Sequence, residues 1–401
     1  MKSGVENKRV VLGVTGSIAC YKAVDLASKL VQGGAMVDVI LTHGASQFVT
    51  ALAFRSITHR PVVTDVFDPG SELSVEHVAL AERADVVVVA PATAHTIAKL
   101  ALGLADDALA TTVLATTAPV VVAPAMDAHM YENPATTENL EKLRSRGVTV
   151  VGPAKGRLAS GLWGWGRLVE PVELVGHIAA VLGRKGDLAG RTVVTSAGGT
   201  AEAIDPVRVI TNRSSGKMGY AIAEAARDRG ARVVLVTAPT ALPDPPAVEV
   251  HRVESAQEMH DAIASLAQNA DVLIMAAAVA DYRPVASAQR KIKKELRDSL
   301  TIELTRNPDV LAETVGPKLK VGFAAETEDL LANARQKLSS KNVDLFVAND
   351  VTAAGAGFGV DTNKVTILDR DGGIQDLPLM TKYEVAHHIL DRVLELLKRG
   401  G

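Results

Sequence analysis

Cysteine and aromatic residues are scarce in this sequence. The single cysteine, Cys20, excludes an intramolecular disulfide framework and a metal site built from several cysteines. Aromatic residues make up only 3% of the chain, too few for a platform on which nucleic-acid bases would stack. Both scarcities favour a protein of the reducing cytoplasm that does not bind nucleic acid.

Neither sign of charge dominates, and no hydrophobic run is long enough to span a membrane. The 43 lysine and arginine residues face 46 aspartate and glutamate residues, for a net charge of −3, whereas nucleic-acid binders usually carry a basic stripe. The longest uncharged stretch, residues 108–126, contains four threonines and two prolines and indicates a helix end, a turn and a buried strand. No apolar signal region is visible at the start. We therefore expect a cytoplasmic protein with no membrane partner.

What the sequence does contain is a regular alternation of strand and helix signals. With 47% hydrophobic and 22% charged residues over 401 positions, the composition is globular and the length suits two domains of about 100–200 residues. In the first half, short apolar runs predict strands at 10–14, 37–41, 85–90 and 119–123, and helical spacing predicts a helix at 18–32. Runs that are apolar on both faces indicate a parallel sheet covered by helices on both sides.

The pattern starts again after a short polar, glycine-rich segment at residues 182–190, which predicts a linker. Further strands are expected at 191–195, 232–236, 271–275, 345–348 and 365–368, and helices at 218–229 and 382–398. The predicted fold class is therefore α/β, with two tandem doubly wound, Rossmann-like domains at residues 1–183 and 188–401. In such domains, ligands bind at the carboxyl ends of the strands.

The turn after the first predicted strand contains Gly13, Gly16, Ser17 and Ile18, directly before a helix. Glycine lets the backbone approach a ligand, and the free N–H groups at a helix start suit a phosphate. An ordinary tight turn explains the glycines equally well. The GxGxxG pattern of dinucleotide sites is absent, and Thr42 stands where an acidic residue would follow the second strand. A nicotinamide cofactor is therefore disfavoured.

Two further strand ends carry small and hydroxyl residues. The segments 90–94, with Thr93, and 123–127, with Met126, suit the approach of a flat ring system, although either one alone is also typical of a proline-containing loop. His77 lies near the start of a predicted helix, where nothing local distinguishes a catalytic base from a surface histidine.

Taken together, four segments of the first half resemble the flavin-containing cysteine decarboxylases. They are Gly-Ser-Ile-Ala-x-Tyr-Lys at 16–22, Val-Glu-His at 75–77, Ala-Pro-Ala-Thr-Ala at 90–94 and Pro-Ala-Met at 124–126. The resemblance implies an FMN cofactor that oxidises a cysteinyl thiol, loss of the adjacent carboxylate as CO2, and reduction of the product. It also implies that His77 is the active-site base. The FMN site that it implies comprises Gly16, Ser17, Ile18, Thr42, Thr93 and Met126.

Two positions depart from this family. Asp127 stands where an asparagine that meets the substrate is usual, and Ser160 stands where many members have a flap cysteine that acts as the acid in the final reduction. A thiol has a reference pKa of about 8.5, and a serine hydroxyl is a far weaker acid. We therefore expect either a buried, protonated Asp127 or trapped water to supply the proton in place of Ser160.

Polar clusters also follow strands in the second half. Residues 205–217, with Arg208 and Asn212, offer cations, hydroxyls and a glycine turn to a phosphate without forming a Walker A loop. Asp281 ends an apolar strand at a position suited to Mg²⁺ or a ribose. The run Lys-Ile-Lys-Lys at 291–294 is either a phosphate-binding patch or a solvated face.

These clusters resemble the phosphopantothenate–cysteine ligases. The matching segments are Thr-Ser-Ala-Gly-Gly-Thr at 195–200, Asp-Pro-Val-Arg at 205–208, Thr-Asn-Arg-Ser-Ser-Gly-Lys-Met-Gly at 211–219, Ala-Ala-Val-Ala-Asp-Tyr at 277–282, Lys-Ile-Lys-Lys at 291–294, Asn-Pro-Asp at 307–309 and Val-Gly-Phe-Ala-Ala-Glu-Thr at 321–327. The resemblance implies that CTP activates the carboxylate of phosphopantothenate as an acyl-cytidylate, which the amine of cysteine then attacks. Because the transition state gathers negative charge, lysines and Mg²⁺ should supply most of the acceleration.

The same resemblance implies roles for single residues. Lys291 and Asn212 are implied in catalysis, Arg208 and Asn212 in substrate binding, and Asp281 in metal binding. The implied nucleotide-binding residues are Ala277, Asp281, Lys291, Asn307, Pro308, Asp309, Val310, Phe323, Lys337 and Lys341.

The two resemblances cover essentially the whole chain and imply a bifunctional enzyme that makes 4′-phosphopantetheine for coenzyme A. The alternatives are a ligase whose flavin domain only oligomerises and a flavoprotein that regulates a partner. Bound yellow flavin would test the cofactor, and CO2 release from phosphopantothenoylcysteine would separate the enzyme from the first alternative. The expected ligands are 4′-phosphopantothenate, cysteine and CTP. A homo-oligomer is expected, with trimeric contacts of flavin domains and dimers of ligase domains.

Overall fold

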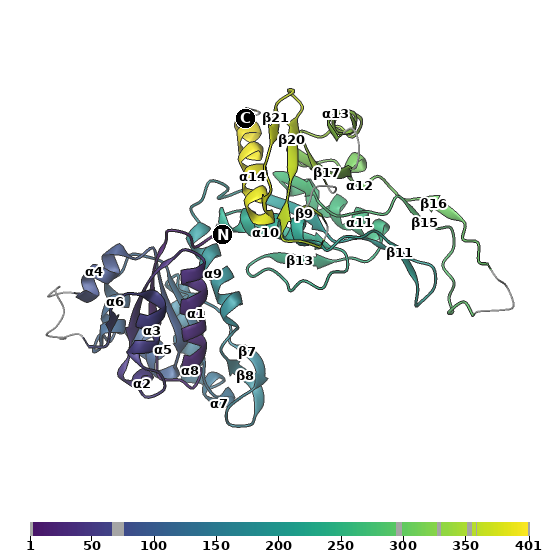
Figure 1. The fold of residues 1–401 in the computed structure, drawn as a ribbon. Helices are drawn as coiled ribbons and strands as arrows, with labels where there is room; N and C mark the ends of the chain where they lie inside the picture. Colours follow the sequence, from purple (N-terminus) through teal and green to yellow (C-terminus); the bar gives the residue numbers. More distant parts are fainter. Residues whose placement is uncertain are drawn as a thin grey trace. The chain divides into compact units, whose positions relative to one another are not determined.

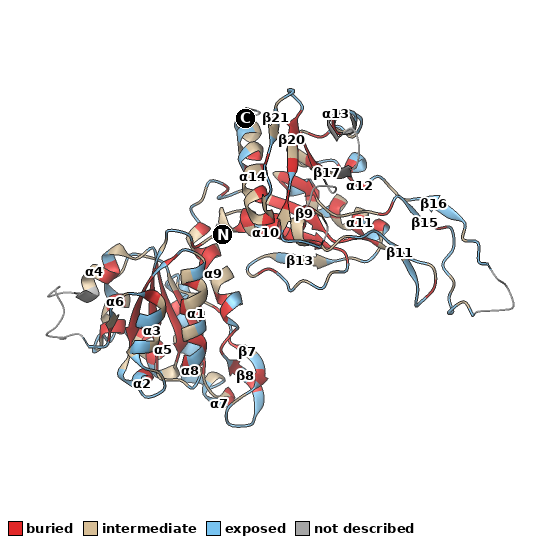
Figure 2. Cartoon of the chain, in the orientation of Figure 1, coloured by how far each residue is buried: buried red, intermediate tan, exposed pale blue. Residues whose placement is uncertain are grey.

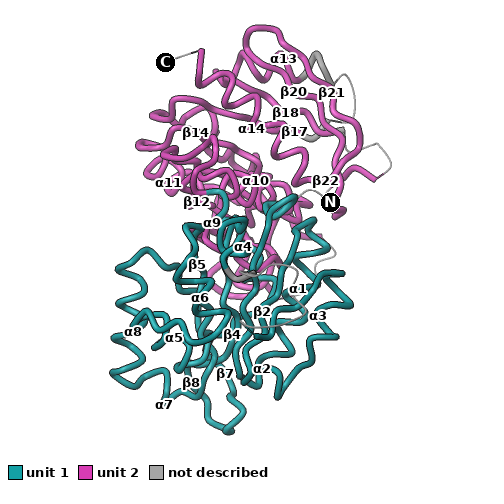
Figure 3. The backbone as a smooth tube through the Cα atoms, turned by 90° about the vertical axis from the view of Figure 1, so that its left-hand side faces the viewer, with its two compact units in different colours: residues 1–183 teal, residues 184–401 magenta. Residues whose placement is uncertain are grey.

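The computed structural model describes residues 3–65, 76–293, 299–326, 330–350, 355–357 and 359–399. The chain forms two compact units, Met1–Gly183 and Arg184–Gly401 (Figures 1 and 3). Each unit has its own sheet and its own hydrophobic core, so each is described by itself.

The first unit is built on a six-stranded sheet in the order β3-β2-β1-β4-β5-β6, and every pairing in it is parallel. The strands are β1 (Arg9–Val14), β2 (Met36–Leu41), β3 (Val62–Val63), β4 (Val86–Ala92), β5 (Val120–Pro124) and β6 (Thr149–Val150). The four central strands are valine-rich runs buried on both faces, which is the pattern that predicted them. The predicted parallel sheet is confirmed.

Helices cover both faces of this sheet. They are α1 (Cys20–Gln32), α2 (His43–Ser46), α3 (Ala51–Thr58), α4 (Glu76–Arg83), α5 (Ala94–Leu102), α6 (Ala108–Ala115), α7 (Ala128–Tyr131), α8 (Pro134–Ser145) and α9 (Pro171–Gly183). Alternate residues of β1 enter different cores. Val10 and Leu12 pack with α1 and α9, and Val11 packs with α5, α6 and α8. A two-stranded hairpin of β7 (Ala154–Arg157) and β8 (Trp163–Arg167) precedes α9.

The first helix begins later than its apolar spacing predicts. It starts at Cys20 rather than Ile18, because Ser17 belongs to the turn after β1. The N–H of Cys20 donates to the carbonyl of Ser17, and the N–H of Ala19 donates to the Ser17 hydroxyl. The turn therefore leaves Ile18 exposed at the carboxyl edge of the sheet.

The second unit is built on an eight-stranded sheet in the order β13-β12-β9-β14-β17-β18-β20-β21. Its strands are β9 (Thr192–Ala197), β12 (Arg232–Thr237), β13 (Glu249–Arg252), β14 (Val272–Met275), β17 (Leu319–Glu326), β18 (Leu345–Asp350), β20 (Val365–Asp369) and β21 (Ile374–Asp376). The first six in that order pair in parallel, whereas β20 and β21 are antiparallel to their neighbours. The strand predicted at 365–368 is therefore present, but it reverses the direction of the doubly wound series.

Helices also cover both faces of the second sheet. They are α10 (Lys217–Asp228), α11 (Ala256–Leu266), α12 (Val310–Glu313), α13 (Leu330–Ser340) and α14 (Lys382–Arg399), with a 3-10 turn, η1 (Ala267–Asn269). Residues of α10 and α14 share one core, and residues of α11, α12 and α13 share the other. Figure 2 shows that the buried residues follow the strands and the inner faces of these helices. Among the described residues, no helix has the length and apolar character needed to cross a bilayer.

Short strand pairs extend from the second sheet. They are β10 (Ala201–Ala203) with β11 (Val209–Thr211), β15 (Tyr282–Pro284) with β16 (Leu304–Arg306), and β19 (Thr362–Asn363) with β22 (Met380–Thr381). Figure 1 shows β15 and β16 reaching well outside the sheet of this unit. The chain between β15 and β16 carries Lys291.

Candidate active sites

In the first unit, two loops at the carboxyl edge of the sheet approach each other closely. A Cβ atom added at Gly16 would lie 2.8 Å from the carbonyl carbon of Gly44, so the position accepts no side chain without a shift of backbone. Gly16 follows β1, and Gly44 lies in α2, directly after β2. Glycine at position 16 is therefore needed for the close packing of the turn after β1 against α2, whether or not a ligand also approaches this turn.

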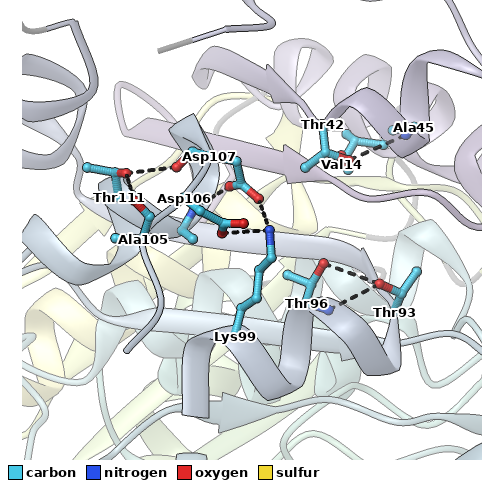
Figure 4. A network of polar contacts seen from close by, with 11 residues as sticks. Val14, Thr42, Ala45, Thr93, Thr96, Lys99, Ala105, Asp106, Asp107 and Thr111 are labelled. Carbon is cyan, nitrogen blue, oxygen red and sulfur yellow. Dashed lines mark hydrogen bonds and ion pairs between the residues drawn. The ribbon is translucent and has the colours of Figure 1, made fainter. Parts of the chain in front are cut away.

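Two predicted cofactor residues, Thr42 and Thr93, cap helices. The Thr42 hydroxyl accepts from the N–H of Ala45 at 3.3 Å and donates to the carbonyl of Val14 at 3.2 Å. The Thr93 hydroxyl accepts from the N–H of Thr96 at 3.3 Å (Figure 4). Both residues lie where the strands β2 and β4 end, at the predicted edge of the sheet. Their hydroxyls are already engaged within the chain as N-caps, a role that the sequence analysis did not assign.

A cavity of about 400 Å³ lies beside these loops. It brings together Ser17 and Ile18 from the first turn, Met126 and Asp127 from the end of β5, and Ser160 from the hairpin. Gly16, Thr42 and Thr93 do not line it. Three segments that are far apart in the sequence thus meet at one pocket, as the ligand-binding edge of a parallel sheet requires.

The structure pairs the two residues that depart from the decarboxylase pattern. The Ser160 hydroxyl donates to Oδ2 of Asp127 at 2.5 Å, and the N–H of His129 donates to Oδ1 at 3.1 Å. These donors lower the pKa of the Asp127 carboxyl, with the Ser160 hydroxyl as the larger cause. These contacts favour the charged form of the Asp127 carboxyl, whereas the sequence analysis expected burial to favour the protonated form.

The hairpin lies against the segment that carries Met126. A Cβ atom at Gly166 would stand 2.1 Å from the Met126 carbonyl oxygen, and the N–H of Met126 donates to the Gly166 carbonyl at 2.9 Å. Gly166 has φ +145°, which disfavours a side chain as well. The glycine face of β8 therefore packs inward, and Trp163 and Trp165 on the other face are 73% and 46% exposed.

The predicted base, His77, lies in the first turn of α4, which begins at Glu76. Its side chain lies outside the described residues. The role of His77 therefore remains a prediction from the resemblance.

In the second unit, a cavity of about 830 Å³ opens at the carboxyl edge of the sheet. The predicted nucleotide-binding residues that line it are Ala277, Asp281, Asn307, Pro308, Asp309, Val310, Phe323, Lys337 and Lys341. Asn212 lines it too. These residues come from the segments after β11 and β14, from β17, from the start of α12 and the segment before it, and from the end of α13, so the fold gathers side chains that the sequence spreads widely.

Hydroxyls from β9 and from the turn after it hold the wall of this cavity. The N–H of Ala277 donates to the Ser196 hydroxyl at 3.0 Å, and the N–H of Ala280 donates to the Thr200 hydroxyl at 2.9 Å. The Asn212 amide donates to the carbonyl of Val279 at 3.2 Å. The side chain of Asn212 is therefore oriented along the wall by hydrogen bonds to backbone carbonyls of the segment after β14.

Asn307 stabilises the wall with its side chain. Its amide nitrogen donates to the Ala280 carbonyl at 2.8 Å, and its amide oxygen accepts from Nη1 of Arg283 at 2.8 Å. Nearby, Nζ of Lys341 lies 3.3 Å from a carboxylate oxygen of Asp309. The Asn307 side chain is engaged within the protein, and its contact with a nucleotide remains a prediction from the resemblance.

Two predicted residues lie outside the cavity wall. Lys291 is exposed, and Arg208 reaches the same segment, donating from Nη2 to the carbonyl of Ile292 at 2.6 Å. Neither residue lines the cavity.

The exposed carboxylate of Asp281 fits a magnesium ion held mainly by substrate. No group of three or more histidine, cysteine, aspartate or glutamate side chains suited to a metal occurs in the part of the chain that the structure describes. Magnesium in nucleotide sites is usually bound by one or two carboxylates together with substrate phosphates and water. A single aspartate on a nucleotide-sized cavity is consistent with that donor set.

Comparison with known proteins assigns both units. Residues 2–183 match the family model described as Flavoprotein, and residues 188–397 match that of the DNA/pantothenate metabolism flavoprotein C-terminal domain. The chain is 47% identical over 406 aligned positions to the coenzyme A biosynthesis bifunctional protein CoaBC of Bacillus subtilis (strain 168), covering 99% of both chains. The chain belongs to the CoaBC family.

Further members of the CoaBC family show the same full-length match. The protein from Escherichia coli (strain K12) is 43% identical, with 96% of this chain and 97% of that protein covered. Among solved structures, the C-terminal domain of a CoaBC protein is 44% identical and covers 53% of this chain and 98% of its own, with a TM-score of 0.46. The family membership expected from the sequence is confirmed.

The structure adds one residue to the first CoaBC site that the sequence analysis left without a role. The side chain of Lys22 is 6% exposed and lines the cavity of about 400 Å³. Its Nζ donates to the carbonyl of Leu168 at 2.9 Å and to Glu170 at 2.8 Å, which lowers the pKa of the Glu170 carboxyl. The last position of the Gly-Ser-Ile-Ala-x-Tyr-Lys segment carried this signal. A buried lysine beneath the hairpin is therefore part of the wall.

Proposed function

We propose that the second unit joins cysteine to 4′-phosphopantothenate with CTP, and that the first unit decarboxylates the product to 4′-phosphopantetheine with FMN. The proposed domains are residues 188–401 for the ligase and 1–183 for the decarboxylase. The observation that carries the proposal is the cavity of about 830 Å³, whose wall holds all but one of the predicted nucleotide-binding residues. Family membership supports it over the full chain.

The proposed ligation has two bond exchanges. A carboxylate oxygen of phosphopantothenate bonds to the α-phosphorus of CTP while the bond to pyrophosphate breaks. The amine of cysteine then bonds to the acyl carbon, gives up a proton, and CMP leaves with the electron pair of the broken C–O bond. Lys291 supplies positive charge to the phosphates, Asn212 holds the acyl intermediate, and Arg208 binds phosphopantothenate. Asp281 would hold Mg²⁺ together with the nucleotide, and the ion would supply further positive charge there.

The first cavity fits a flavin and its thiol substrate. Ile18 and Met126 offer apolar walls to a ring system, and the turn that contains Ser17 lies directly before α1, whose amino-terminal end suits a phosphate. When bound, FMN supplies the two-electron oxidation of the cysteinyl thiol and the later return of the electrons. His77 acts as the base at the substrate. The hydrogen bond from Ser160 to Asp127 holds the hairpin against the end of β5, beside the cavity.

One incubation tests both activities. The purified protein is given 4′-phosphopantothenate, cysteine, CTP and Mg²⁺, and pyrophosphate, CO2 and product masses are followed together. We expect a yellow protein that releases one CO2 for each pyrophosphate, since the product of the ligase is the substrate of the decarboxylase. Pyrophosphate without CO2, even from supplied phosphopantothenoylcysteine, would reduce the first unit to a structural module. Pyrophosphate release with ATP but not with CTP would show that ATP is the nucleotide that the second unit uses.

We also propose a homo-oligomer in which first units contact one another as trimers and second units as dimers. Large apolar side chains at the rim of the first cavity support the former, with Ile18 62% and Tyr21 64% exposed. Val207 and Tyr282 on the strand pairs of the second unit are 63% and 47% exposed and support the latter. Mass measurement in solution checks the assembly, and a monomer would contradict it.

The Ser160–Asp127 pair gives a prediction about the final proton. Because Asp127 is held as a carboxylate, we expect Asp127→Asn to turn over within a few-fold of the parent, since an amide oxygen also accepts from Ser160. Ser160→Ala removes one solvent-exposed hydrogen bond and should be mild. Asp127→Ala strands the hydroxyl and the His129 N–H and should impair turnover most. Product masses are measured, and accumulation of the oxidised enethiol in Asp127→Asn would show that the carboxyl is the acid after all.

A further inference from the structure

The segment that carries Lys291 is held chiefly at the next residue, Ile292. Lys291 and Lys293 are exposed, and Ile292 between them is half-buried. The N–H of Ile292 donates to Oδ2 of Asp205 at 3.1 Å, and its carbonyl accepts from Nη2 of Arg208 at 2.6 Å. Both backbone polar groups of one residue are therefore bound by an acid–base pair from another loop.

Asp205 is well suited to hold this segment, because it is buried and its oxygens are fully occupied. Its exposed fraction is 1%, and Oδ1 accepts from the N–H groups of Val207 and Arg208 at 2.8 and 2.9 Å. Burial alone raises the pKa of the Asp205 carboxyl, but the N–H groups of Val207 and Ile292 and the Arg208 side chain outweigh it and lower the pKa to about 2. The carboxylate is therefore charged at any working pH.

The loop of Asp205 is itself tied to the cavity. It joins β10 to β11, and Asn212 follows β11 directly and lines the cavity of about 830 Å³. A second contact supports the attachment, since the N–H of Ala288 donates to the carbonyl of Ile204 at 3.0 Å. The chain from Ala288 to Ile292 is thus hydrogen-bonded to the same loop that positions Asn212.

We propose that Asp205 is a positioning residue of the ligase, which binds the backbone of Ile292 so that the adjacent Lys291 is presented to the phosphates of the nucleotide. This inference rests on the proposed function of the second unit. A lysine side chain has many rotamers, and fixing the backbone at the next residue removes much of the freedom that a transition-state contact would otherwise have to overcome.

The test is a double-mutant cycle of Asp205→Asn and Lys291→Gln, read as CTP-dependent pyrophosphate release by the full chain. We expect Asp205→Asn to lower kcat by about tenfold or more with little change in KM for CTP, and to add no loss in the Lys291→Gln background. Losses that multiply in the double variant would overturn the positioning role alone. A Lys291→Gln variant of full activity would overturn the role of Lys291 and, with it, that of Asp205.

A matched control and a second readout separate positioning from folding. Asp369→Asn makes the same change in a buried aspartate that accepts backbone N–H groups, at the amino edge of the sheet, where Asp369 pairs with Leu345. It should leave ligation unchanged. Trypsin cleavage after Arg290, Lys291 or Lys293 should be several-fold faster in Asp205→Asn than in Asp369→Asn, because the released segment fits the protease. Equal cleavage rates in both variants would overturn the attachment itself.

Discussion

Replacing Lys291 by glutamine is expected to lower CTP-dependent pyrophosphate release by about 10²–10³-fold, the usual loss when one charged contact to a transition state is removed. The carboxylate, the α-phosphate and the departing pyrophosphate all carry negative charge in the proposed ligation. Glutamine keeps the length and a donor but loses the charge. Pyrophosphate release is measured with saturating CTP, phosphopantothenate and cysteine, so that kcat is read directly.

Lys293→Gln is the matched control for this variant. Lys293 is two residues further on and equally exposed, and it loses the same charge, so it separates a specific contact from a general electrostatic field. We expect it to retain ligation within a few-fold, with decarboxylation of supplied phosphopantothenoylcysteine unchanged in both variants. Equal losses in the two variants would turn the lysine run into a diffuse positive patch without an individual role for Lys291.

Replacing His77 by asparagine is expected to lower the rate of decarboxylation by about 10²–10⁴-fold while leaving bound flavin and ligation intact. A general base accelerates a reaction only if it lies within hydrogen-bond reach of the proton that it moves, and asparagine cannot take up that proton. CO2 release from supplied phosphopantothenoylcysteine is measured, with the flavin spectrum as the check on cofactor binding.

His59→Asn serves as the comparison for His77→Asn. His59 is an exposed histidine of the same unit at the end of α3, with φ 55°, a left-handed conformation that asparagine tolerates well. The variant should therefore fold and decarboxylate like the parent. If His77→Asn behaves the same way, His77 is a surface histidine.

Much of the fold follows from local patterns, because buried parallel strands require apolar residues on both faces. The strands at Val86–Ala92 and Val272–Met275 could be predicted in this way, because each is a continuous apolar run. The reversed direction of β20 could not be predicted, since a strand such as Val365–Asp369 has the same composition whichever way it runs. Direction is decided by the connection before it, and periodicity does not encode that.

Site residues could be predicted where a recognisable motif lies at the end of a strand. They were missed where their hydrogen-bond partners lie far away in the sequence. All but one of the nucleotide-binding residues that the family resemblance implies line the second cavity, where the ends of parallel strands meet at one edge of the sheet. The charged state of Asp127 was missed, since it depends on Ser160, which lies on a hairpin that no local signal aims at that carboxylate. The burial of Lys22 was missed for the same reason, because its partners Leu168 and Glu170 follow the hairpin.

The hairpin of β7 and β8 also gives the protein an optical property. The chain contains two tryptophans, and both lie on the outward face of β8, at Trp163 and Trp165. Emission excited selectively from indole therefore originates from this one hairpin and from no other part of the molecule. Its wavelength and its quenching by added iodide would report, without any label, whether the exposure of this hairpin changes when a ligand binds to the first unit, and signals from the ligase unit would not contribute.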